Sequence, residues 1–246
     1  MAIKLERAFV LAAGLGTRMR PLTDTLPKPL VPLAGRALLD HVLDRIAAAG
    51  ITEAIVNVHY RAEQIEAHLS HRVQPRITIS DERGQLLETG GGVRQALPHL
   101  GKDPFLLHNS DTVWTEPGPQ NLRSLATAFD PSAMDALLLL ADRRKSLGYG
   151  GRGDFHLSSD GRIVRPAKGE TAPFVFAGAS IATPHLLRET PEGPFSLNRV
   201  WDRALGEGRL YGLPLVGTWM HVGDPAALAE AEALIAEARM SNEGRP

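Results

Sequence analysis

A glycine-rich loop near the N-terminus combines the residue types that bind phosphate. It reads LAAGLGTRMRPLT over residues 11–23 and follows a short apolar run. Glycines let backbone N–H groups approach an anion closely, and the planar guanidinium of arginine matches phosphate oxygens. The sequence contains no Walker loop, and Met19 stands where a dinucleotide fingerprint needs its third glycine. A structural turn at Gly14 and Gly16 is the alternative interpretation.

A lysine held between prolines follows this loop. Residues 26–35 read LPKPLVPLAG, and three prolines within six residues stiffen the backbone around Lys28. Such a frame presents the lysine in a fixed direction, which favours a phosphate-binding role. The alternative is an exposed lysine on a rigid loop.

The elements that must position these residues alternate between strands and helices. Apolar runs predict strands at 8–11, 54–58, 77–80, 105–107 and 136–141. Apolar periodicity predicts helices at 38–49, 62–69, 92–97 and 122–129. This alternation is typical of a three-layer α/β domain with a mainly parallel sheet. Ligands bind beyond the carboxyl ends of such strands, where Leu11, Ser80 and Asp111 lie.

The second half of the chain is less regular. Strands are predicted at 155–157, 174–181 and 209–216, the last at a sheet edge because of Pro214. Residues 225–240 form the clearest amphipathic helix. We expect one domain over residues 1–240, whose second half closes over the site, and a frayed tail at 241–246.

Composition narrows the classes of function. The 246 residues carry 27 basic and 28 acidic side chains, a formal net charge of -1, which argues against nucleic acid or anionic lipid as the main partner. The absence of cysteine excludes disulfides and zinc–cysteine sites. No apolar run is long enough for a membrane span, and we expect a cytoplasmic protein. The histidines are interpreted as structural, with His108 and His221 as candidates to support aspartates beside them.

The loop and the lysine segment together resemble the sugar-1-phosphate nucleotidyltransferase family. The resemblance continues with ETGGG at 88–92, NSD at 109–111 and GTWMHVGDP at 217–225, and it covers about residues 9–234. It implies a Rossmann-like three-layer α/β/α sandwich of the nucleotidyltransferase type. It also implies an enzyme that condenses an NTP with a sugar 1-phosphate, giving NDP-sugar and pyrophosphate with Mg²⁺.

The resemblance assigns each role to a set of residues. The nucleotide would be bound by Ala13, Gly14, Gly16, Thr17, Arg18, Glu88 and Gly91. The sugar phosphate would be bound by Lys28, Asp154 and Gly178. The metal would be held by Asp111 and Asp224. Catalysis would depend on Arg18, Lys28 and Asp111.

Three segments narrow the resemblance further. LETGGG at 87–92, GDF at 153–155 and FAGAS at 176–180 are similar to N-acetylmuramic acid α-1-phosphate uridylyltransferases of cell-wall sugar recycling. That would make UTP and N-acetylmuramic acid α-1-phosphate the substrates, used by a monomer. The alternatives are a mannose-1-phosphate guanylyltransferase or another NDP-hexose pyrophosphorylase, a phosphocholine-type cytidylyltransferase, and a non-catalytic nucleotide-sugar-binding module.

Two positions depart from the family pattern. Many relatives carry an E-K-P tripeptide whose lysine binds the sugar phosphate; here Arg165 precedes Pro166 and Lys168 follows, so either could substitute, or neither. His221 stands where W-x-D-V-G has aspartate, which leaves the metal role to Asp224. Asp224 also precedes Pro225 at the start of a helix, so a helix cap is the alternative for it.

Overall fold

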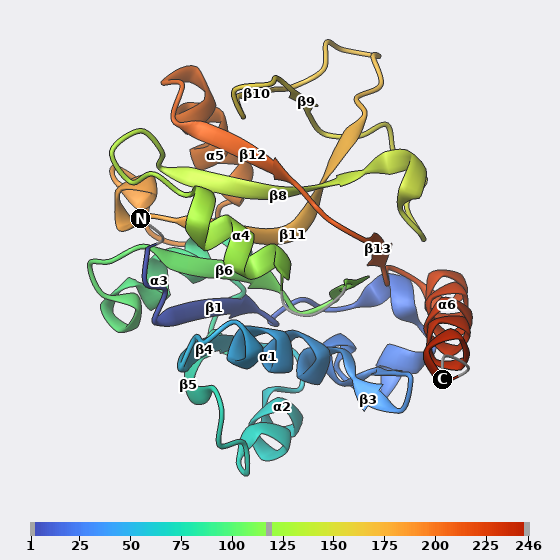
Figure 1. The fold of residues 1–246 in the computed structure, drawn as a ribbon. Coiled ribbons are helices and arrows are strands. Elements are labelled where there is room, and N and C mark those ends of the chain that lie inside the picture. Colours follow the sequence, from blue (N-terminus) through green and yellow to red (C-terminus); the bar gives the residue numbers. More distant parts are fainter. Residues whose placement is uncertain (1–2, 117–119, 244–246) are drawn as a thin grey trace.

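The computed structural model describes residues 3–116 and 120–243, built around a seven-stranded sheet (Figure 1). Its order is β12-β8-β11-β6-β1-β4-β5. The strands are β1 Arg7–Leu11, β4 Glu53–Val58, β5 Arg76–Asp81, β6 Phe105–Asn109, β8 Ala136–Asp142, β11 Phe174–Ala182 and β12 Leu210–Pro214. Every neighbouring pair is parallel except the two pairs that β11 makes. The predicted mainly parallel sheet is confirmed, and so is the edge position of the strand that contains Pro214.

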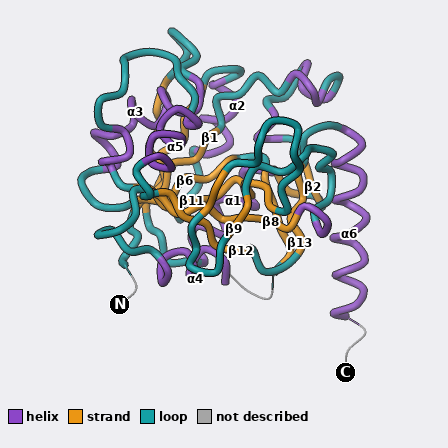
Figure 2. The backbone as a smooth tube through the Cα atoms, turned by 90° about the horizontal axis from the view of Figure 1, so that it is seen from above, coloured by secondary structure: helices purple, strands orange, loops and turns teal. Residues whose placement is uncertain are grey.

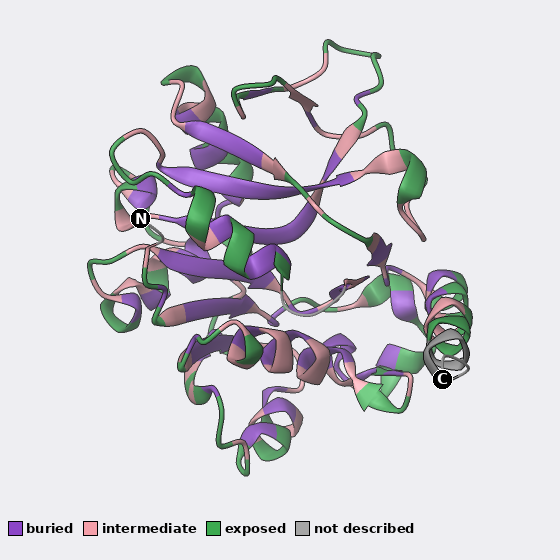
Figure 3. Cartoon of the chain, viewed as in Figure 1, coloured by how far each residue is buried: buried purple, intermediate pink, exposed green. Residues whose placement is uncertain are grey.

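Helices cover both faces of this sheet. One face carries α1 Leu38–Ala48, α2 Ala62–Leu69 and α4 Gln120–Ala128, and the other carries α3 Glu88–Leu100 and α5 Leu197–Gly206. Each group buries its apolar stripe in a separate core cluster against the strands. Figure 3 shows buried strands between helices whose outer sides are exposed. The predicted three-layer α/β/α sandwich is therefore confirmed.

A third core cluster lies beside the sheet. It joins the helix α6 Pro225–Glu243 to short strand pairs, β2 Pro32–Leu33 with β3 Arg36–Ala37, and β7 Thr112–Thr115 with β13 Thr218–His221. In Figure 2, α6 stands at the flank of the molecule. A further pair, β9 His156–Leu157 with β10 Ile163–Val164, lies in the second half. Among the described helices, none is long and apolar enough to cross a membrane.

Two predicted helices have other bounds in the structure, and some elements were not predicted at all. The helix predicted at 92–97 begins at Glu88 and ends at Leu100, so the glycine stretch is helical and Pro98 lies in the last turn. The helix predicted at 225–240 continues to Glu243, and residues 244–246 of the expected tail lie outside the described residues. The helix α5 and the β7–β13 pair were not predicted.

Candidate active site

A cavity of about 340 Å³ lies at the carboxyl ends of β1 and β6. It is the position at which parallel α/β sheets bind ligands. The predicted residues that line it are Ala13, Gly14, Gly16, Thr17, Arg18, Lys28, Glu88 and Asp111. The N–H of Ser110 donates to the carbonyl of Leu11 at 3.1 Å, which joins the glycine loop to the turn that carries Asp111.

The glycine loop and the lysine segment are packed as one unit. Gly16 has φ 65°, and a Cβ there would lie 2.9 Å from the Cβ of Lys28. The Thr23 hydroxyl donates to the Gly16 carbonyl at 2.9 Å. Gly14 is exposed, and no atom lies within 4 Å of a Cβ built on it. Gly16 is therefore required for close packing, whereas Gly14 leaves open space beside the cavity.

Lys28 and Asp111 form an ion pair in the cavity wall. The Lys28 Nζ lies 2.6 Å from Asp111 Oδ2, and the two side chains are 10% and 25% exposed. Burial raises the pKa of the Asp111 carboxyl, but the charge and hydrogen bond of Lys28, together with His221 and a backbone hydrogen bond, lower it by more, so the net shift is downward. Asp111 is thus an ionised carboxylate at neutral pH. Arg18, by contrast, is exposed and makes no hydrogen bond or ion pair within the described residues.

Two buried residues that the sequence analysis missed hold the start of the glycine loop in place through hydrogen bonds. The Asn57 Oδ1 accepts hydrogen bonds from the N–H groups of Ala12 and Ala13 at 2.6 and 3.3 Å. Its Nδ2 donates to Glu82 Oε1 at 2.7 Å, and both side chains are buried and line the cavity. Burial raises the pKa of Glu82. A lone asparagine inside the apolar run AIVNV was the signal that could have identified this pair.

Of the residues at 88–92 that were predicted to border the nucleobase, the structure places only one at the cavity. Glu88, at φ 57°, and Thr89 line the cavity. Gly91 does not: it is buried in α3, where a Cβ would lie 2.4 Å from the Gly193 carbonyl oxygen. Gly91 therefore packs against the backbone at Gly193 and does not reach the cavity surface.

A second hollow of about 220 Å³ adjoins the first and shares Leu11, Thr89 and Asn109 with it. Gly178 lines this hollow at φ 81°, where a Cβ would meet Thr112 Cγ2 at 2.5 Å. Asp154 is not part of the lining. Its Oδ2 accepts a hydrogen bond from the N–H of Phe176 at 2.9 Å, so it fixes the β11 backbone just before Gly178.

The two candidates to replace the E-K-P lysine differ in their surroundings. Arg165 donates to Asp202 Oδ1 at 2.7 Å and to Asn198 Oδ1 at 2.9 Å, and Asn198 lines the second hollow. Lys168 is exposed and makes no hydrogen bond or ion pair within the described residues. The structure therefore connects Arg165, and not Lys168, to the lining of the second hollow.

The β7–β13 pair brings the two predicted metal ligands to one region. It sets His221 opposite Thr112, the residue after Asp111, and Asp224 follows three residues after His221. Burial lowers the pKa of His221, and its ring is within electrostatic range of both aspartates as well as Arg18 and Lys28. Gly223 lines the cavity, but Asp224 does not. The Oδ1 of Asp224 accepts from the Ala227 N–H at 2.9 Å, the geometry of a helix cap.

His108 has no place in the cavity wall. Its ring is fully buried against Trp114, with ring centroids 5.3 Å apart, and burial lowers its pKa to about 3. A neutral, packed imidazole agrees with the structural interpretation of this histidine.

Comparison with known proteins gives one family. The family described as nucleotidyl transferase matches residues 7–164. An N-acetylmuramate alpha-1-phosphate uridylyltransferase of Caulobacter vibrioides is 50% identical over 94% of this chain and 97% of its own. An N-acetylmuramate alpha-1-phosphate uridylyltransferase of Neisseria meningitidis is 35% identical over 93% of this chain and 97% of its own. A mannose-1-phosphate guanyltransferase of Aspergillus fumigatus is 32% identical over 89% of this chain and 61% of its own.

Solved structures agree on the fold. UDP-glucose pyrophosphorylase complexed with UDP-glucose superposes with a TM-score of 0.74 at 16% identity, over 96% of this chain and 100% of its own. At that identity the likeness establishes the fold alone. The family match over residues 7–164 and the relatives at 50% and 35% identity show that this chain belongs to the nucleotidyl transferase family and is an enzyme of that class.

Proposed function

We propose that this enzyme transfers a uridylyl group from UTP to N-acetylmuramic acid α-1-phosphate, giving the UDP-sugar and pyrophosphate. The observation that carries the proposal is a single cavity that holds an unpaired arginine and a buried lysine–aspartate pair beside an open glycine loop. Those groups suit two phosphate-bearing substrates. The choice of base and sugar is supported by the relative from Caulobacter vibrioides, at 50% identity.

The chain's own residues act by positioning and by neutralising charge. The attacking oxygen of a sugar phosphate is already anionic, so the reaction needs no general base, and in-line displacement at the α-phosphorus depends on bringing two anions together. Arg18 and the glycine loop around Gly14 would hold the triphosphate. Lys28 would neutralise charge near the reacting phosphorus, and its pairing with Asp111 keeps its side chain in one place.

The carboxylates in and beside the cavity suit Mg²⁺. Asp111 lines the cavity and Asp224 follows Gly223, which also lines it; both offer hard carboxylate oxygens, and no group of three or more metal-binding side chains occurs among the described residues. Mg²⁺ commonly takes one or two protein carboxylates and completes its shell with water and phosphates. Asp111 and Asp224 would hold the ion, which would supply charge neutralisation for the phosphates.

The second hollow is the proposed sugar side. Gly178 would border the sugar, and Asp154 would support it through the Phe176 N–H. Arg165 would contact the sugar phosphate once it exchanges a present partner for it. We further propose a monomer that acts in the cytoplasm, where UTP is made.

A matrix of four NTPs against sugar 1-phosphates, read as pyrophosphate release, tests the proposal. The highest kcat/KM is expected for UTP with N-acetylmuramic acid α-1-phosphate. The 32% identity to a mannose-1-phosphate guanyltransferase makes GTP with mannose 1-phosphate the second candidate, and a preference for that pair would replace the proposal. No pyrophosphate from any pair, with nucleotide sugars still bound, would indicate a non-catalytic module.

A further inference from the structure

A buried pair, Asn57 and Glu82, lies between the two segments that would bind the nucleotide. Asn57 is the next-to-last residue of β4, and Glu82 follows the last residue of β5. Both residues are 2% exposed, and both line the cavity. A buried carboxylate is costly unless it accepts hydrogen bonds. The hydrogen bonds that hold Glu82 come from both nucleotide-binding segments, directly or through Asn57.

Backbone N–H groups fix the direction of each of these hydrogen bonds. At one end, the N–H groups of Ala12 and Ala13 donate to Asn57 Oδ1. The amide nitrogen of Asn57 must therefore face Glu82, and it donates to Oε1 at 2.7 Å. At the other end, the N–H of Leu87 donates to Glu82 Oε2 at 3.1 Å. Both carboxylate oxygens thus accept from N–H donors, as an ionised carboxylate does.

The hydrogen-bonded path joins the start of the glycine loop to the start of α3. Leu87 is the residue before α3, and Glu88 and Thr89, which follow it, line the cavity. The helix passes close to the pair, because a Cβ at Gly92 would lie 2.5 Å from Glu82 Oε1. The segment predicted to border the nucleobase and the loop predicted to hold the triphosphate therefore share one buried carboxylate.

We propose that Glu82 and Asn57 are positioning residues that transmit the docking of the correct nucleobase to the glycine loop, so that the base contributes to catalysis as well as to binding. The inference rests on the proposed function, in which the base lies beside residues 88–89 and the triphosphate beside the loop. A base that fits its side of the cavity holds the Leu87 N–H in place, and the carboxylate and the amide then hold the start of the loop. An arrangement completed only by the correct substrate increases discrimination between nucleotides.

Isosteric substitutions can break this path and rebuild it. Glu82→Gln replaces one acceptor by an N–H donor, and whichever way the two amides turn, one donor then faces another. Asn57→Asp sets two buried carboxylates against each other. In the double variant Asn57→Asp/Glu82→Gln, the new carboxylate accepts from the loop and from the new amide, whose oxygen accepts from the Leu87 N–H. The double variant thus keeps every hydrogen bond of the path and the single buried charge, with one bond reversed.

Steady-state kinetics with two nucleotides test the assignment: UTP and CTP, each with N-acetylmuramic acid α-1-phosphate, the second assayed at high enzyme concentration. Glu82→Gln should lower kcat/KM for UTP about 10- to 100-fold, mainly through kcat, because a charge-assisted hydrogen bond is lost. Its kcat/KM for CTP should change less than about 3-fold, so the preference for UTP falls. The double variant should return to within about 3-fold of wild type with both nucleotides.

A buried amide elsewhere provides the structural control. The side-chain amide of Asn121 bonds to the carbonyl and the N–H of Val216 at 2.9 and 2.8 Å, and Asn121 lines neither the cavity nor the second hollow. Asn121→Asp should lower the free energy of unfolding but leave the UTP-to-CTP ratio of kcat/KM unchanged, with rates taken per folded enzyme. Gly92→Ala, whose added methyl would displace Glu82 Oε1, is a second variant and should show the same selective loss with UTP.

The outcomes separate the coupling from the proposed function. Equal losses with both nucleotides in Glu82→Gln and Gly92→Ala, no loss with either, or no recovery in the double variant would overturn the coupling and leave the proposed function standing. A wild-type enzyme that makes no pyrophosphate from UTP and the muramic acid phosphate would overturn both.

Discussion

Arg18 and Lys28 lie in one cavity but are held in different ways. Lys28 is buried and paired with Asp111, so its charge is fixed in place before substrate arrives. Arg18 is exposed and without a partner among the described residues, so it is free to follow the triphosphate. The first arrangement favours stabilisation of a transition state, and the second favours capture of a substrate.

Replacing either cation should reduce turnover. Arg18→Ala and Lys28→Ala are each expected to lower kcat/KM about 100- to 1,000-fold, measured as pyrophosphate release, because a preorganised donor to developing charge is typically worth about 3–4 kcal/mol. Arg18→Ala should leave the free energy of unfolding unchanged within about 0.5 kcal/mol. Arg20→Ala is the matched control, since that side chain is 67% exposed and paired only with Asp24. Near wild-type kcat/KM in either variant would show that the replaced residue is not needed for the reaction.

Asp224 has two candidate roles that substitution can separate. Its Oδ1 caps α6, and asparagine caps a helix about as well as aspartate. Asp224→Asn should therefore keep the melting temperature but weaken Mg²⁺ binding in the presence of UTP, measured by metal titration. Asp224→Ala should also lose about 1 kcal/mol of stability. Unchanged Mg²⁺ binding and full activity at limiting Mg²⁺ in Asp224→Asn would leave Asp111 as the one aspartate of the pair that acts as a ligand.

At the scale of elements, α3 shows why the glycine stretch was misassigned. Three consecutive glycines lower helix propensity and look like a loop in the sequence. In the structure Gly90, Gly91 and Gly92 each face a neighbour that leaves no room for a Cβ: Phe195, the Gly193 carbonyl and Glu82. The glycines let a helix approach these groups closely, and tertiary contacts override the local preference.

Two helical glycines give a matched test of this reading. A Cβ at Gly90 would lie 2.3 Å from the Phe195 ring, whereas one at Gly206, in α5, would have no neighbour within 4 Å. Gly90→Ala should lower the free energy of unfolding by about 1–3 kcal/mol through overpacking. Gly206→Ala should raise it by up to about 1 kcal/mol, because alanine favours a helix. Chemical denaturation measures both, and equal effects would contradict the packing argument.

The elements that the sequence predicted well are those whose signal is local. The apolar run 136–141 and the amphipathic segment 38–49 carry enough periodicity to identify β8 and α1. The β7–β13 pair was missed, because each strand has only four residues and their pairing joins distant segments. The cavity residues of the glycine loop followed from a motif, but Asn57 and Glu82 did not, because their role exists only once three strands lie side by side.

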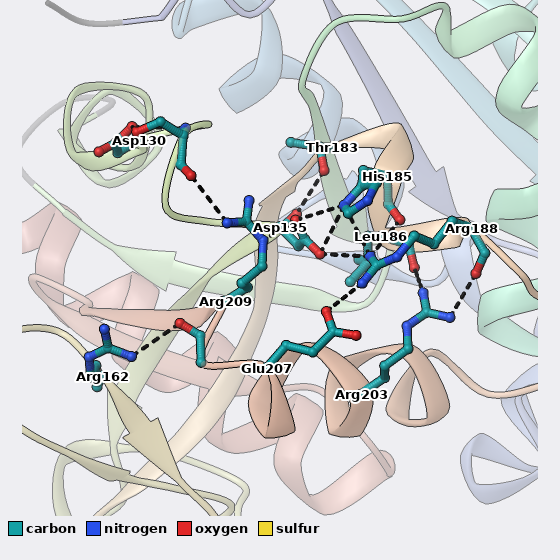
Figure 4. Close-up of polar contacts among 12 residues, drawn as sticks. Asp130, Asp135, Arg162, Thr183, His185, Leu186, Arg188, Arg203, Glu207 and Arg209 are labelled. Carbon is teal, nitrogen blue, oxygen red and sulfur yellow. Dashed lines mark hydrogen bonds and ion pairs between the residues drawn. The ribbon is translucent and has the colours of Figure 1, made fainter.

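At the scale of the whole molecule, one buried carboxylate connects several strands of the second half of the chain. It lies at the end of the sheet opposite the cavity. Asp135, whose side chain is 1% exposed, precedes β8. Its carboxylate accepts from Arg209 at 2.8 Å, Arg188 at 2.9 Å and His185 at 3.1 Å (Figure 4). Its N–H and carbonyl bond to Arg209 and Thr183. One residue thus joins the amino ends of β8 and β12 to the carboxyl end of β11.

Removing this carboxylate should destabilise the fold without changing the chemistry. Asp135→Ala is expected to cost about 3 kcal/mol, the lower end for a broken buried ion pair, because the arginines it leaves behind are about a quarter exposed and can hydrate. The kcat/KM of the folded enzyme should stay within about 3-fold of wild type, since the cavity lies at the far end of the sheet. Asp160→Ala, which removes a carboxylate that is 61% exposed, is the control and should cost less than about 0.5 kcal/mol.

The ionisation of the Asp135 carboxylate makes the difference in unfolding free energy between wild type and an Asp135 variant depend on pH. Burial raises the pKa of Asp135, but hydrogen bonds from the three basic side chains lower it by more, so its pKa in the folded protein is below the ordinary value. A depressed pKa stabilises the fold above the unfolded-state value of about 4, and that contribution is lost as pH falls through the folded-state value. The gap in unfolding free energy between wild type and Asp135→Asn should therefore be constant from pH 8 to about pH 5 and shrink below about pH 4. Urea denaturation across this range measures it, and a gap that widens in acid would show that Asp135 does not act through its ionised form.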